Sequence, residues 1–202
     1  MGRQSSGVRG GLQPGDSSYH GKIDGVASLN TIKDPKVFKD VKEAISRYHA
    51  VMGVRERNVK LANLSPGTLG VQVTSADGKS EAIYLNKKSF NQKESKIIEQ
   101  TKKGYNSGWH TQTNKPIAHT VTHELGHATW NSDLSSPSAR AAGKEIKSLY
   151  RQWSKDNKKT GYGKYARTNV DEFWAETVTK AVHGKSDKYT TAAKRIAKKY
   201  KL

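Results

Sequence analysis

The sequence His123-Glu124-Leu125-Gly126-His127 constrains this chain more than any other feature, because its two histidines are four residues apart. Residues at this spacing lie on one face of an α-helix, about one turn apart, so both imidazoles can reach one metal ion. Glu124 follows the first histidine and can hold a water molecule beside such an ion. The pattern predicts half of a hydrolytic zinc centre on a single helix.

The residues around this motif have the pattern of a half-buried helix. Ile117, Val121 and Leu125 recur every four residues, and Pro116 lies where a helix can begin. Glycine inside a helix costs about 1 kcal/mol relative to alanine. We interpret Gly126 as room for the close approach of another segment, such as one that carries a third ligand. The alternative is an amphipathic helix with two surface histidines.

A zinc centre of this type requires a third protein ligand and leaves one position open. The chain has no cysteine, so the ligand must be His, Glu or Asp. Downstream candidates are His183 and the acidic stretch 171–176. Glu172 and Glu176 are four residues apart and share a helical face, so one can bind the metal while the other supports a ligand histidine. Glu172 can also be explained as part of a capping box that begins at Asn169.

The other histidines lack partners that the sequence can show. His119 precedes His123 by four residues, but one ion cannot take ligands from three successive turns of a straight helix, because the outer turns are about 12 Å apart. We therefore expect His119 to have no metal role, or only a contact at the rim of the site. We interpret the remaining four as structural or solvated: His20, His49, His110 and His183.

The segment that contains the candidate third ligand resembles a known family. Residues 165–176, YARTNVDEFWAE, follow HELGH and are similar to the Y-x-R-T-N-x-x-E-F-F-A-E segment of the catalytic domain of anthrax lethal factor and related gluzincin-type zinc peptidases. The resemblance covers roughly residues 115–182 and departs at Trp174, where the family has phenylalanine. It implies that Glu172 is the third zinc ligand, that Tyr165 stabilises the oxyanion and that Glu176 has a supporting role, where many gluzincins carry aspartate.

This resemblance implies a zinc-dependent endopeptidase. Zinc bound by His123, His127 and Glu172 would activate a water molecule that attacks the peptide bond, and Glu124 would accept the proton of that water. The resemblance also implies a zincin-like α+β fold. Such a fold has a small mixed sheet with a backing helix, the HExxH helix and a helical C-terminal part.

A second resemblance implies a biological setting rather than a mechanism. The sequence Gly108-Trp109-His110 and the run 119–127, HTVTHELGH, are similar to metallopeptidase-type domains of bacteriophage minor head proteins. The implied role is that of a virion or head-morphogenesis structural protein, with phage head components as partners.

Hydrophobic patterns predict a Gly- and Ser-rich arm over residues 1–33 and one domain over residues 34–202. Alternating runs predict strands over 59–62, 69–73 and 82–85, with Asp77-Gly78 as the turn between the last two. We expect Ala82 to Asn86 to be the edge strand that pairs with an extended substrate. Helices are predicted over 35–51, 92–103, 117–129, 137–155, 170–183 and 190–200.

The chain is strongly basic, with 36 Lys and Arg against 18 Asp and Glu and a net charge of +18. A peptidase does not need this charge, which favours a polyanionic partner, either nucleic acid or an acidic protein surface. A lysine-coated soluble surface explains it equally well. Three hypotheses remain: a zinc endopeptidase, a virion protein whose peptidase-like domain contacts packaged DNA, and a DNA-associated protease.

The sequence shows no membrane or export segment. No apolar run approaches the roughly 20 residues that span a bilayer, and the N-terminus lacks the hydrophobic stretch of a signal peptide. The absence of cysteine fits a reducing compartment or a virion. We therefore expect a cytoplasmic or virion-associated protein without a membrane partner.

Overall fold

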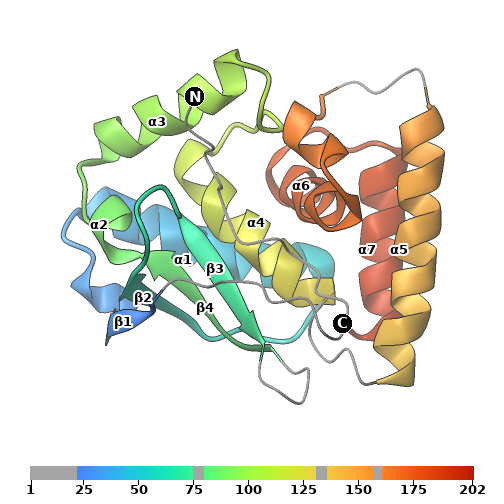
Figure 1. The fold of residues 1–202 in the computed structure, drawn as a ribbon, viewed down its shortest axis with the longest axis horizontal. Coiled ribbons are helices and arrows are strands. Elements are labelled where there is room, and N and C mark those ends of the chain that lie inside the picture. Colours follow the sequence, from blue (N-terminus) through green and yellow to red (C-terminus); the bar gives the residue numbers. More distant parts are fainter. Residues whose placement is uncertain (1–21, 75–79, 131–135, 157–160) are drawn as a thin grey trace.

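A computed structural model of the chain describes residues 22–74, 80–130, 136–156 and 161–202. Over these residues a four-stranded mixed sheet lies in one half of the molecule with the first helices around it, and the C-terminal helices lie together in the other half (Figure 1). The α+β class and the small mixed sheet agree with the sequence prediction. The predicted turn at Asp77-Gly78 lies outside the described residues.

The sheet has the strand order β1-β2-β4-β3. Strand β1 (Asp24–Ala27) runs antiparallel to β2 (Val59–Asn63), and β2 runs parallel to β4 (Ser80–Asn86). Strand β3 (Gly70–Thr74) is antiparallel to β4 and forms one edge of the sheet. The prediction that Ala82 to Asn86 is the edge strand is therefore wrong. Strand β4 is interior because it pairs with both β2 and β3, and strand order depends on such long-range pairing.

Part of the predicted N-terminal arm belongs to the folded domain. Strand β1 and the short 3-10 helix η1 (Leu29–Thr31) lie within residues 1–33. The Asn63 amide donates a hydrogen bond from Nδ2 to Asp24 Oδ1 at 2.8 Å, and Leu29 is buried in the main core. The predicted boundary at residue 33 is thus too late, because the sheet already begins at Asp24.

Helix α4 (Pro116–Trp130) runs through the centre of the molecule, between the sheet and helix α6 (Val170–His183) (Figure 1). Helix α1 (Pro35–Met52) lies behind the sheet in this view and packs against α4. Every residue of α4 from Ile117 to Trp130 is buried except Thr120. The expected half-buried helix is therefore covered on almost all sides.

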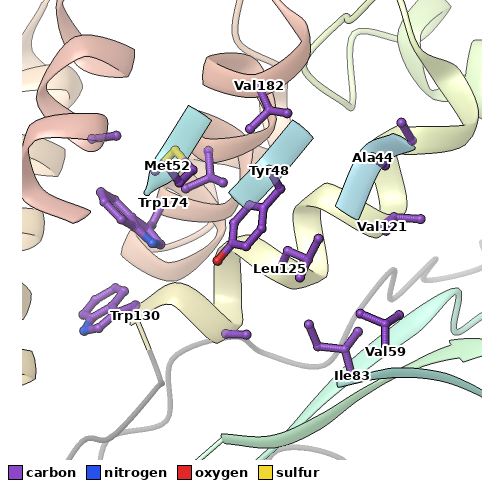
Figure 2. Packing of buried hydrophobic residues seen from close by; sticks show 14 of the residues in the cluster. Ala44, Tyr48, Met52, Val59, Ile83, Val121, Leu125, Trp130, Trp174 and Val182 are labelled. Carbon is purple, nitrogen blue, oxygen red and sulfur yellow. The ribbon is translucent and has the colours of Figure 1, made fainter. Parts of the chain in front are cut away.

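One hydrophobic core joins these layers. Figure 2 shows Tyr48 of α1 and Leu125 of α4 between Trp174 of α6 and Ile83 of β4. The polar end of Tyr48 is satisfied in this core, because its hydroxyl lies 2.6 Å from Thr129 Oγ1. The core thus holds α4 against both the sheet and α6.

The remaining elements frame this centre. Helices α2 (Lys87–Phe90) and α3 (Glu94–Asn106) follow the sheet, and the 3-10 helix η2 (Lys164–Arg167) precedes α6. Helices α5 (Pro137–Lys155) and α7 (Lys188–Tyr200) pack side by side next to α6 (Figure 1). No helix among the described residues combines the length and apolarity that a membrane span requires.

Candidate metal centre

Helices α4 and α6 approach each other unusually closely at Gly126. A β-carbon at this position would lie 2.8 Å from Ala175 Cα, a distance that real β-carbons essentially never show. Because glycine has no β-carbon, α6 can bring Glu172 to the face of α4 that carries His123 and His127. The predicted close approach of another segment at Gly126 is confirmed.

The start of α6 is fixed by its N-cap. The side chain of Asn169 accepts hydrogen bonds from the backbone N–H groups of Asp171 and Glu172, both at 2.9 Å. These bonds satisfy two N–H groups that have no partner within the first turn of a helix. Glu172 therefore lies in a well-defined first turn, and its side chain is free to point toward α4.

The donor atoms of His123, His127 and Glu172 converge on one point. The two Nε2 atoms are 3.1 Å apart, and Glu172 Oε2 lies 3.1 Å from Nε2 of His123 and 3.4 Å from Nε2 of His127. Ligand atoms that surround zinc tetrahedrally at about 2.0 Å are about 3.3 Å apart. The three atoms therefore have the spacing of one face of such a tetrahedron.

The burial of these side chains supports the same interpretation. His123, His127 and Glu172 are each 2 to 4% exposed. Glu172 Oε2 is buried and makes no hydrogen bond within the described part of the chain, although both imidazoles are near it. A buried carboxylate oxygen without a hydrogen bond is costly, and a metal ion would satisfy it. The residues present fit a zinc ion.

Glu176 supports His123 from the side opposite to Glu172. Its Oε1 lies 3.0 Å from His123 Nδ1, and its Oε2 accepts a hydrogen bond from the backbone N–H of Thr111 at 2.7 Å. Such a bond at Nδ1 fixes the orientation of an imidazole and leaves Nε2 available as a ligand. The spacing of four residues on α6 thus places one carboxylate at each nitrogen of His123.

The electrostatic balance of the cluster favours a cation. Burial alone would lower the pKa of His123, but its close contacts with the carboxylates of Glu172 and Glu176 hold this pKa well above its usual range. Burial opposes the ionisation of Glu172, yet attraction to His127 and His123 lowers its pKa to about 2. Glu176 is held ionised in the same way by His119 and His123. Two buried carboxylates with this charge suit a divalent ion.

Glu124 and Tyr165 flank the cluster. Glu124 is 2% exposed, and its burial raises the pKa of the carboxyl group. It contacts the edge strand, because a β-carbon on Gly70 would lie 2.6 Å from Glu124 Cγ. The ring of Tyr165 stacks on that of His123 with centroids 5.6 Å apart and on Trp109 at 5.5 Å. Both predicted catalytic residues therefore lie beside the three candidate ligands.

The structure also groups two histidines that the sequence analysis set aside. His119 is 3% exposed, and its Nε2 lies 3.3 Å from Glu176 Oε1. The ring of half-buried His110 is 5.1 Å from that of His119, and its burial lowers the pKa of His110 to about 4. The rim contact that was expected as one alternative for His119 does not fit, because this side chain is buried on α4. The interpretation of His110 as structural or solvated also misses this contact.

One feature of the sequence could have predicted the contact between His119 and Glu176. The histidines at 119, 123 and 127 and the glutamates at 172 and 176 each repeat every four residues, so two facing helices would pair them turn by turn. His110 had no such signal, because it lies in the loop that connects α3 to α4.

The other histidines are placed differently. His183 Nε2 lies 2.9 Å from Thr122 Oγ1, and His49 Nδ1 lies 3.3 Å from the backbone oxygen of Val54. Both contacts agree with a structural role and keep His183 out of the candidate ligand set. His20 lies outside the described residues.

Comparison of the chain with protein-family profiles, with curated protein sequences and with solved structures found no match in any of the three. Its function must therefore be inferred from the side chains of this site.

Proposed function

We propose that this protein is a zinc-dependent endopeptidase of the gluzincin type. The observation that carries the proposal is the convergence of donor atoms from His123, His127 and Glu172 at 3.1 to 3.4 Å from one another, beside the carboxyl group of Glu124. The resemblance of residues 165–176 to the gluzincin segment supports the same activity.

Each residue has a role that follows from its chemistry. The chemistry that a bound zinc ion supplies is polarisation of the scissile carbonyl and activation of a water molecule near neutral pH. Glu124 accepts the proton of that water and delivers it to the leaving amine. Its raised pKa brings this carboxyl group closer to the pH at which it must both take up and release a proton. Tyr165 donates a hydrogen bond to the oxyanion as negative charge develops.

An extended peptide would bind along strand β3. This strand is at the edge of the sheet, so the outer side of its backbone has no strand partner among the described residues and is where a substrate would pair. Gly70 brings the same edge against Glu124. A peptide that pairs with β3 would therefore pass beside the proposed base. Binding through the backbone of an extended segment suits an endopeptidase.

The experiment that tests the proposal combines zinc content with cleavage of a peptide library. Glu124→Gln should keep the fold and the tightly bound zinc but lose hydrolysis by a factor of about 100 or more, because an amide cannot accept the proton. His127→Ala should lose hydrolysis and the zinc ion held by His123, His127 and Glu172. Normal turnover by Glu124→Gln would overturn the peptidase mechanism.

A second candidate function is contact with a polyanion, as expected for a virion protein or a DNA-associated protease. The specific observation is a row of exposed basic residues on helix α5. This row consists of Arg140, Lys144, Lys147, Arg151 and Lys155. Helix α7 adds Lys188, Arg195, Lys198 and Lys199. Several α7 cations are paired, because Arg195 and Lys199 contact Glu145 and Lys188 contacts Asp156.

A further inference from the structure

The histidine and glutamate side chains beside the candidate zinc centre form a second group of possible metal ligands. His110, His119 and Glu176 each offer one donor atom, and these atoms lie within 4.8 Å of one another. They come from three separate segments: the loop before α4, helix α4 and helix α6. We infer that these three residues bind a second divalent transition-metal ion of the zinc class. The inference does not depend on peptidase activity.

The local structure holds His110 in place. A β-carbon on Gly104 would lie 2.2 Å from His110 Cδ2, and a β-carbon on Gly163 would lie 2.3 Å from the backbone carbon of His110. The backbone N–H of His110 also donates to the carbonyl oxygen of Gly104 at 3.2 Å. Two glycines from different parts of the chain thus make room for this histidine. A solvated side chain would not need such space.

One imidazole nitrogen of each histidine in this group is buried without a hydrogen bond among the described residues. In the described residues neither His110 Nδ1 nor His119 Nε2 has a hydrogen-bond partner. His119 Nε2 is nevertheless only 3.3 Å from Glu176 Oε1. A buried polar atom normally has a partner, so an unpaired nitrogen that faces a carboxylate calls for an explanation. An ion bound between the two atoms provides one.

The candidate zinc centre of His123, His127 and Glu172 also combines a short nitrogen–carboxylate distance with a missing hydrogen bond. Glu172 Oε2 lies 3.1 Å from His123 Nε2 and likewise makes no hydrogen bond within the described part of the chain. The distance of 3.3 Å between His119 Nε2 and Glu176 Oε1 matches the separation of about 3.3 Å between two ligand atoms of tetrahedral zinc. His110 completes the second group with a donor atom that lies within 4.8 Å of the other two.

The chemistry of the donors defines the class of ion. Two imidazoles and one carboxylate suit zinc and the neighbouring divalent transition metals, whereas calcium and magnesium prefer oxygen ligands alone. Glu176 is ionised, so its charge compensates part of the charge of a dication. The proposed ligand set has the composition of the first centre.

Glu176 links the two sites. Its Oε1 lies 3.0 Å from His123 Nδ1 and 3.3 Å from His119 Nε2. An ion at the second site would draw electron density from the oxygen that orients His123, and supporting bonds of this kind affect metal affinity. Occupation of the second site should therefore weaken binding at the first.

The test is a count of bound zinc in the full chain, first stripped with a chelator and then dialysed against a fixed concentration of free Zn²⁺. Wild type should bind two equivalents, and His110→Phe and His119→Phe should each bind one. Phenylalanine keeps a ring of similar size, and far-UV circular dichroism shows which variants are folded. The matched control is His49→Phe, which replaces a half-buried histidine outside both groups and should keep two equivalents.

The same count separates this inference from the proposed function. His127→Ala should lose one equivalent and keep the one at the second site. If wild type and His110→Phe both bind one equivalent with equal affinity, the second site is refuted and the cluster is a hydrogen-bonded support for His123. If His127→Ala binds as much zinc as wild type while His110→Phe loses one equivalent, the first centre fails and the second stands. Should His119→Phe not fold, His110→Phe decides the question.

Discussion

Gly70 on the edge strand lies so close to Glu124 on α4 that any side chain at position 70 would collide with the carboxyl-bearing arm of that glutamate. The contact joins the strand proposed to bind substrate to the residue proposed to accept the proton. The three candidate ligands are not part of this contact, because Gly70 meets only Glu124 among its nearest neighbours. A substitution at this position therefore tests the proposed base separately from the metal.

Gly70→Ala should reduce peptide hydrolysis without reducing zinc content. The new β-carbon would lie 2.6 Å from Glu124 Cγ, so either the strand or the glutamate must move. A displacement of about 1 Å in a catalytic group can lower the rate about 100-fold. The measurement is kcat/KM on a peptide substrate, with zinc counted in the same preparation. Full activity in Gly70→Ala would mean that the position of Glu124 does not limit the reaction.

Gly126→Ala should destabilise the protein and weaken zinc binding, although alanine favours a helix by about 1 kcal/mol over glycine. The β-carbon would meet the backbone of Ala175, which cannot rotate away. Overpacking of this kind typically costs about 1 to 3 kcal/mol, and the shift of α6 would carry Glu172 away from the histidines. Urea unfolding and zinc affinity measure the two effects.

The matched control is Gly143→Ala on helix α5. Its β-carbon would meet the Trp130 side chain at 3.2 Å and no backbone atom among its three nearest neighbours, so the loss of stability should be smaller and zinc affinity unchanged. Equal losses of stability in Gly126→Ala and Gly143→Ala would show that α4 and α6 do not pack more closely than other helices of this protein.

His183 should make the fold sensitive to mild acid. Burial, together with the nearby positive charges of Arg47 and other cations, lowers its pKa to about 4. Its Nδ1 is buried without a hydrogen-bond partner among the described residues, so a proton there would remain unsatisfied. Because the folded pKa lies below the unfolded value of about 6.5, the stability is fully present above pH 6.5 and is lost as the pH falls toward 4.

The expected loss from this group is about 2 kcal/mol between pH 7 and pH 5. His183→Gln removes the titrating group, so the variant should lose less stability than wild type over this interval, even if it is less stable at pH 7. Urea unfolding midpoints at pH 7 and pH 5 measure the loss of stability in wild type and in His183→Gln. An identical pH dependence in the two proteins would show that His183 does not titrate in this range.

The basic row on α5 should bind DNA without sequence preference if the polyanion hypothesis is correct. The logarithm of affinity should fall linearly with the logarithm of salt concentration, with a slope of about 0.9 per neutralised phosphate. Replacing Lys144, Lys147, Arg151 and Lys155 with glutamine should flatten this slope and leave zinc content and peptide cleavage unchanged. These four side chains are exposed on α5, away from the three ligands.

An acidic polypeptide of matched charge is the necessary comparison, because it would show a similar salt dependence. Preferential binding to duplex DNA supports a nucleic-acid role. Absence of binding at about 50 mM salt, where such contacts are strongest, would leave the net charge of +18 as a property of solubility.

Local signals predicted the helices well. Helices α5 and α6 have the predicted bounds, because each begins at a capping side chain, Ser136 or Asn169, and continues with an apolar stripe. The shared face of His123 and His127 also follows from local spacing on one helix, whereas Glu172 was expected as their partner only from the resemblance to the gluzincin segment. Strand order does not follow from local spacing, because alternation within β3 and β4 does not indicate which of them pairs with β2.

The place of His110 in the second group of possible ligands could not be predicted from the sequence either. Nothing in the sequence near His110 brings it to His119, because that contact depends on the path of a loop past Gly104 and Gly163. Strand β1 was missed for a related reason. Its four residues, DGVA, have no clear alternation and become a strand only by pairing with β2.

The nearly complete burial of α4 has a consequence for how this chain acquires its chemistry. A helix without an open face gains its stability only when the sheet and α1 cover one side and α6 the other. His123 and His127 lie on that helix, and Glu172 arrives from a segment that is synthesised later. A nascent chain thus cannot bring the three candidate ligands together until α6 has docked. A misfolded or cleaved copy in which α6 has left α4 would lose the proposed metal site. The proposed peptide hydrolysis would then occur only in the completely folded protein.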